Sequence, residues 1–132
     1  MIGLDTNVLV RFFTRDDEAQ ARAARNFIEH EVSADAPGYV SLVTLAELAW
    51  VLRSRYKVTR PELIDTIEAL LHEPSIRVQD ENAVWVALDF CEQPGITFSD
   101  ALIAAVNRLN GCSHTVTFDD KATRIGGMTL LR

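Results

Sequence analysis

Short apolar runs alternate with longer amphipathic segments along the chain of 132 residues. Short apolar runs favour buried strands, whereas apolar residues spaced by three and four positions favour helices. The pattern predicts strands over residues 1–4, 39–40, 76–78, 115–117 and 128–131. It predicts helices over residues 8–13, 16–30, 42–56, 80–92 and 100–109, another between Thr59 and Pro74, and a helical turn over residues 120–125.

Polar residues at the boundaries indicate where these elements begin. Asp16, Ser41 and Ser99 are expected to cap their helices, since short polar side chains accept hydrogen bonds from the free N–H groups of the first turn. The strand over residues 1–4 is expected to be buried on both faces, because its apolar residues do not alternate with polar ones. Strands that alternate with helices predict an α/β fold with a parallel sheet and helices on both faces. No repeat or long linker divides the chain, so we expect one domain over residues 1–132.

Composition excludes several classes of protein. With 19 acidic and 13 basic residues, the chain has a formal net charge of -6 and does not hold nucleic acid by bulk positive charge. Cys91 and Cys112 are far apart and have no neighbouring histidine cluster, which argues against a zinc site or a disulfide framework. Neither a signal peptide nor a membrane span is predicted, and the expected location is the cytoplasm.

Four carboxylates lie where strands end or apolar helices begin. Asp5 and Asp119 directly follow predicted strands, Glu47 lies within the apolar segment VTLAELAWVL, and Asp100 begins the apolar segment DALIAAV. The carboxyl ends of parallel strands are the usual place for ligands. These acids can therefore lie along the same rim of the sheet.

Each of these acids also has a structural explanation. Asp5 can cap the helix that follows, and Glu47 can complete a capping box with Thr44. Asp100 is favoured in a first helical turn by the helix dipole, and one of Asp119 and Asp120 can cap the turn that follows them. Of these two, Asp119 is better placed to face a site, because it comes immediately after the strand.

Together, the four acids favour a site for a divalent cation. Carboxylates that share a pocket repel one another and raise one another's pKa, and a cation removes this conflict. Ligands that are all oxygen favour Mg²⁺ or Mn²⁺ over zinc. Such a site suits phosphodiester hydrolysis by metal-activated water.

The chain resembles PIN-domain proteins, and most of all the VapC toxins of bacterial type II toxin-antitoxin pairs. The segments that carry the resemblance, in chain order, are LDTNVLV, SLVTLAELAWVL, FSDALIAA and TFDDKA. It implies a three-layer α/β/α sandwich around a central, mainly parallel sheet of about five short strands. It also implies a Mg²⁺- or Mn²⁺-dependent endoribonuclease that forms a homodimer and binds a VapB-type antitoxin.

The resemblance also implies roles for individual residues. Asp5, Glu47, Asp100 and Asp119 are the expected catalytic acids, of which Asp5, Asp100 and Asp119 are expected to bind the metal ion. Asp120 remains an alternative to Asp119. The expected supporting polar residues are Thr6, Asn7, Ser99 and Thr117. Near the first strand, Arg11 and Arg15 are the candidates for contact with RNA.

Two other functions remain open at this stage. A receiver-like regulatory domain is similar in size and binds Mg²⁺ through acids at strand ends. It would be phosphorylated near mid-chain, where Asp80 is better placed as a helix cap. The other alternative is a catalytically idle PIN domain that serves as a binding module.

Overall fold

Three short parallel strands organise the first part of the chain. The computed structural model describes residues 1–132, which divide into two compact units, Met1–Gln79 and Asp80–Arg132. In the first unit, β2 (Gly38–Val40) lies between β1 (Ile2–Gly3) and β3 (Ile76–Val78) and pairs in parallel with both. The carboxyl ends of all three strands therefore lie at the same edge of the sheet.

Hydrogen bonds beyond the strands tie this edge together. The Leu4 N–H donates to the Tyr39 carbonyl at 2.9 Å, and the Gln79 N–H donates to the Val40 carbonyl at 2.9 Å. The Gln79 side-chain oxygen accepts a hydrogen bond from the Leu42 N–H at 2.9 Å. The segments that leave the three strands are thus fixed side by side.

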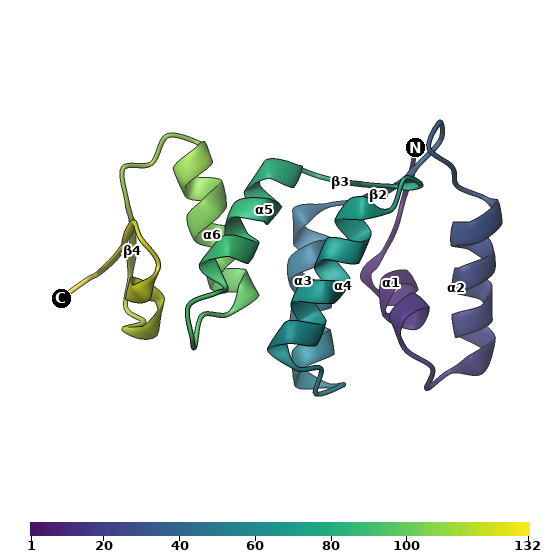
Figure 1. Ribbon diagram of the computed structural model, residues 1–132, viewed down its shortest axis with the longest axis horizontal. Coiled ribbons are helices and arrows are strands. Elements are labelled where there is room, and N and C mark those ends of the chain that lie inside the picture. Colours follow the sequence, from purple (N-terminus) through teal and green to yellow (C-terminus); the bar gives the residue numbers. More distant parts are fainter. The chain divides into compact units, whose positions relative to one another are not determined.

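Four helices complete the first unit (Figure 1). They are α1 (Thr6–Phe13), α2 (Glu18–His30), α3 (Leu42–Ser54) and α4 (Arg60–His72). α1 packs against α2 and α3, and α3 packs against α4. Their fully buried side chains form the core of the unit: Leu9, Leu45, Leu48, Leu52, Ile67 and Leu70.

The second unit contains two helices and a two-stranded ladder. α5 (Glu81–Phe90) packs against α6 (Phe98–Leu109), which buries small residues such as Ala101 and Ala105. β4 (Thr115–Thr117) pairs in parallel with β5 (Met128–Leu130), and the single 3-10 helix, η1 (Lys121–Arg124), connects them. A hydrogen bond of 3.0 Å from the Asn107 side-chain nitrogen to the Thr115 hydroxyl ties α6 to β4.

The predicted fold class is confirmed. All five expected strands are present, all their pairings are parallel, and helices alternate with them as the hydrophobic pattern predicts. The strands pair as a three-stranded ladder in the first unit and a two-stranded ladder in the second. None of the helices has the length and apolar character needed to cross a membrane.

One expectation about burial is wrong. The first strand is not buried on both faces, and the Ile2 side chain is 46% exposed. β1 is an edge strand of its ladder, hydrogen-bonded only to β2. An unbroken apolar run therefore does not identify a strand that is covered on both faces.

Two predicted caps are also wrong, one by a single residue and the other by two residues. Asp17, rather than Asp16, caps α2, because the Asp16 carboxylate is bound to other side chains. Thr97 caps α6 in place of Ser99, since the helix already begins at Phe98. By contrast, the prediction that Ser41 caps α3 is confirmed.

Candidate active site

Asp5 lies between β1 and α1, and its carboxylate can serve two roles. It is the N-cap of α1, and its Oδ1 accepts a hydrogen bond from the Thr6 N–H at 2.8 Å. Its Oδ2 has no hydrogen-bond partner, and the residue is exposed at the carboxyl end of the strand. The structural and functional explanations of Asp5 are therefore compatible, because each needs only one carboxylate oxygen.

The two residues after Asp5 differ in exposure. Thr6 is buried, with 4% of its surface exposed, and contributes its backbone N–H to the cap. Asn7 is exposed in the first turn of α1. Thr6 thus fixes the Asp5 carboxylate from within, while the Asn7 amide is accessible.

Glu47 extends from the second turn of α3 and has no polar partner. The capping box with Thr44 is wrong, because Ser41 is the N-cap and Thr44 lies inside the helix, where its N–H donates to the Ser41 hydroxyl. Leu45 and Leu48 on the same helix are fully buried, whereas Glu47 is exposed. The Glu47 carboxylate makes no hydrogen bond or ion pair, which leaves both its oxygens free to bind a ligand.

Asp100 lies in the first turn of α6 in the second unit. Its N–H donates to the Thr97 hydroxyl at 3.1 Å, and its half-buried carboxylate makes no hydrogen bond. Ser99 precedes it inside the helix. A carboxylate in this first turn also interacts favourably with the helix dipole.

Asp119 and Asp120 have different local roles. The Asp119 N–H donates to the Thr117 hydroxyl at 3.0 Å, and its Oδ1 accepts a hydrogen bond from the Lys121 N–H at 2.9 Å. Asp120 occupies the position before η1, but its side chain makes no cap hydrogen bond. It is therefore the Asp119 side chain that orders the turn, contrary to the expectation that Asp120 would do so and leave Asp119 free. Asp119 retains its second carboxylate oxygen.

The four predicted acids are divided equally between the units. Asp5 and Glu47 belong to the first unit, and Asp100 and Asp119 to the second. No group of three or more metal-ligating side chains lies within either unit. The chemistry of the donors fits a hard divalent cation, because each acid has at least one carboxylate oxygen without a partner and none is held in an ion pair.

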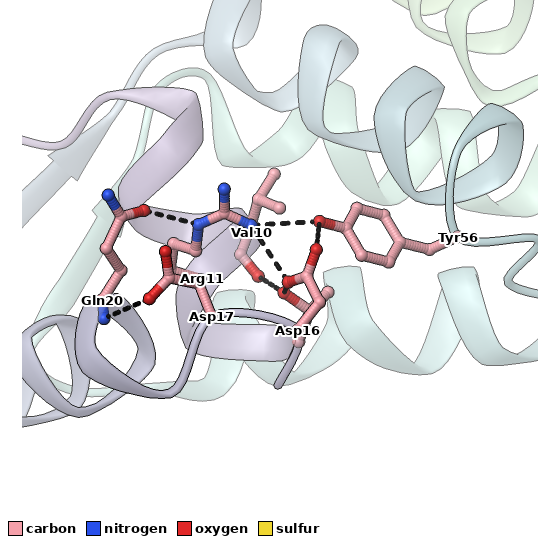
Figure 2. Close-up of polar contacts among 7 residues, drawn as sticks. Val10, Arg11, Asp16, Asp17, Gln20 and Tyr56 are labelled. Carbon is pink, nitrogen blue, oxygen red and sulfur yellow. Dashed lines mark hydrogen bonds and ion pairs between the residues drawn. The ribbon is translucent and has the colours of Figure 1, made fainter.

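Arg11 is the centre of a polar network in the first unit (Figure 2). Its Nη1 donates to Asp16 Oδ1 at 3.0 Å and to the Tyr56 hydroxyl at 3.1 Å, and its Nε donates to Gln20 Oε1 at 2.6 Å. The Tyr56 hydroxyl in turn donates to Asp16 Oδ2 at 2.8 Å. This network links the last turn of α1 to the start of α2 and to the segment after α3.

The network also changes the titration of Asp16. The hydrogen bond from the Tyr56 hydroxyl, with smaller contributions from Thr14 and Arg11, lowers the pKa of the Asp16 carboxyl below its ordinary value. Arg15, the other candidate for RNA contact, is exposed and makes no hydrogen bond. The two arginines thus differ, because Arg11 is fixed and Arg15 is free in solvent.

The comparison with protein families removes one of the alternatives left open by the motifs. The PIN-domain model matches residues 2–128. The chain belongs to the PIN-domain family. A similar protein is the VapC ribonuclease of Aquifex aeolicus (strain VF5), which is 23% identical over 127 residues, 96% of this chain and 93% of that protein.

PIN-domain membership confirms the resemblance carried by the four motifs and excludes the receiver-like alternative. A receiver domain would need the aspartate that accepts its phosphoryl group near Asp80. Asp80 itself has a left-handed backbone (φ 45°), and its side chain makes no cap hydrogen bond. The expectation that Asp80 lies at a helix cap is confirmed, since it is the N-cap residue of α5. The residues that the motifs did not indicate are Asp16, Gln20 and Tyr56, whose network joins distant segments of the PIN domain.

We predict that Tyr56→Phe raises the pKa of Asp16, because the substitution removes the hydroxyl that donates to the carboxylate. The lowered pKa of the folded state stabilises the protein above the pKa of the unfolded state, and this contribution is lost as the pH falls through the folded pKa. NMR titration of the Asp16 carboxyl carbon measures the shift directly.

Tyr39→Phe is the matched control, since the Tyr39 hydroxyl makes no hydrogen bond. We expect it to leave the Asp16 titration unchanged. An equal Asp16 pKa in wild type and Tyr56→Phe would contradict the network.

Proposed function

We propose that this PIN domain is a Mg²⁺- or Mn²⁺-dependent endoribonuclease. The observation that carries the proposal is that all four motif acids, in a chain matched by the PIN-domain model over residues 2–128, keep carboxylate oxygens free of partners. The similarity to a protein named VapC ribonuclease supports RNA as the substrate. Four accessible acids also argue against an idle domain that serves only as a binding module.

We further propose that the two units act as a single domain over residues 1–132 and that Asp5, Glu47, Asp100 and Asp119 meet at one site. The family match extends across both units, which supports a joint function. In the first unit, α1 and α3 begin at the edge of the sheet where β1 and β2 end. Asp119 follows β4 in the same way that Asp5 follows β1. Parallel strands that end in carboxylates are suited to sharing one ligand.

In this proposal, Asp5, Asp100 and Asp119 hold the cation through their unpartnered oxygens. The bound cation would lower the pKa of water and neutralise charge on the phosphate. Glu47 would accept a hydrogen bond from the attacking water and so orient it. The Thr6 N–H and the Thr117 hydroxyl hold Asp5 and the Asp119 backbone in place, and Asn7 and Ser99 are available as polar neighbours.

The proposed biological role is that of the toxin in a VapBC toxin-antitoxin pair. The name of the Aquifex aeolicus relative supports this role. The proposal includes a VapB-type antitoxin as partner, a homodimer as the assembly and the cytoplasm as the location. A small DNA-binding protein encoded directly upstream would be the expected antitoxin.

We predict that Asp5→Asn, Glu47→Gln and Asp100→Asn each lower the rate of RNA cleavage by about 100-fold or more, since each removes a charge from the site. Asn at position 5 can still cap α1, so the fold is preserved. The measurement is single-turnover cleavage of cellular RNA with Mg²⁺ or Mn²⁺, and EDTA should abolish it.

The control variants are Asp35→Asn and Glu29→Gln, which remove exposed acids that have no partner and no place in the motifs. Both should cleave at the wild-type rate. Wild-type protein that leaves RNA intact, or acid variants that cleave as well as the controls, would contradict the proposed function.

We predict that Asp119→Asn abolishes cleavage, while Asp120→Asn retains it. Asn at position 119 can still accept the Lys121 N–H, so the turn remains and only the charge is lost. The two variants should be compared by cleavage rate and by Mn²⁺ affinity. Loss of both properties in Asp120→Asn alone would assign the fourth acid to Asp120.

A further inference from the structure

A cavity of about 450 Å³ lies next to the end of β1, entirely within the first unit. Its apolar wall includes Leu4 from the end of β1, Val8 from α1 and Phe27 from α2. Leu4 directly precedes Asp5 in the chain. The volume is in the range of sites that hold small organic ligands, and such sites combine apolar walls with a few fixed polar groups.

The polar groups of the cavity are Asn7, Arg11 and Gln20. Asn7 and Arg11 are four residues apart on α1 and therefore share one helix face. Since Arg11 only donates hydrogen bonds, the atom of Gln20 that faces its Nε must be the oxygen. The Gln20 amide nitrogen and the Arg11 Nη2 make no hydrogen bond. The rim of the cavity is thus rich in hydrogen-bond donors.

The charge of Arg11 does not make this cavity a phosphate site. Asp16 neutralises the guanidinium at 3.0 Å, and the Asp17 carboxylate lies in the same loop and binds the Gln20 N–H. A phosphate would gain little electrostatic energy here, because the positive charge is already paired. A neutral, planar ligand with hydrogen-bond acceptors on its edge fits both the apolar wall and the rim.

We propose that this cavity holds a nucleobase of the RNA next to the phosphodiester bond that is cleaved. Bases of single-stranded RNA can leave the stack, bind against apolar and aromatic side chains and present their acceptor-rich edges to donors. The cavity is lined by Leu4, the residue before Asp5, and by Asn7, two residues after it, so a bound base would lie close to Asp5 in the proposed active site. The inference rests on the proposed ribonuclease function and assigns Arg11 to a base edge instead of a phosphate.

The test measures binding of nucleotides to the full chain without metal, so it does not depend on cleavage. The probes are AMP, GMP, CMP and UMP, with ribose 5-phosphate as the control that lacks a base. At least one nucleotide should shift the NMR signals of the Asn7, Ala23 and Phe27 amides at millimolar concentration, and ribose 5-phosphate should not.

Matched substitutions on α2 locate the site. Ala23 lines the cavity and is exposed, whereas Ala19, one turn earlier, is exposed and does not line it. Ala23→Trp should weaken nucleotide binding at least tenfold, while Ala19→Trp should not change it. Gln20→Glu keeps a side-chain oxygen that accepts the hydrogen bond from Arg11 but removes the amide N–H donors. This substitution should also weaken nucleotide binding.

The outcomes separate this inference from the proposed function. No shift with any nucleotide, or equal shifts with ribose 5-phosphate, would overturn the nucleobase site, even if RNA is cleaved. Equal binding by Ala23→Trp and Ala19→Trp would also overturn it. If nucleotides bind to the wild-type chain and to Ala19→Trp but not to Ala23→Trp, the result would support the site, even if the chain does not cleave RNA.

Discussion

The parallel pairing of β1, β2 and β3 is the constraint on which the first unit depends. Parallel strands leave their sheet at the same edge, so the start of α1 and the start of α3 are fixed near each other. Each helix that begins there needs an acceptor for its free N–H groups, and Asp5 and Ser41 supply it. A cap that is a carboxylate also brings charge to this edge. Asp5 can stabilise α1 with one oxygen and bind a ligand with the other.

Charge repulsion connects this geometry to chemistry. Carboxylates that approach one another without a cation destabilise the folded state or become protonated. The four acids of this PIN domain make no ion pairs, so no basic side chain compensates their charge. A divalent cation would supply that compensation and, at the same time, the means to activate water. In the proposed function, a cation would thus allow acids that repel one another to share a site for hydrolysis.

Local patterns in the sequence were sufficient for the secondary structure and the family, but not for the polar network. Ser41 was predictable as a cap because it is the one short polar side chain between β2 and α3. Asp16 and Asp17 are chemically identical neighbours. Hydrogen bonds from Arg11, Thr14 and the distant Tyr56 hold Asp16, and Asp17 caps α2. Burial of β1 was misjudged for a related reason, since apolar composition does not show how many neighbours a strand has.

The candidate acids were predictable as residues, because each belongs to a motif: Asp5, Asp100 and Asp119 lie near element boundaries, and Glu47 lies in an apolar helix. Their convergence remains a proposal, since Asp5 and Glu47 lie in one unit and Asp100 and Asp119 in the other. The most direct measurement is NMR line broadening by substoichiometric Mn²⁺ on the full chain. Our account predicts that signals around all four acids broaden together, and that Asp5→Asn weakens the broadening in both units. Broadening that is confined to one unit of the wild-type chain would contradict a shared cation site. So would broadening around Asp100 and Asp119 that is the same in Asp5→Asn as in the wild type.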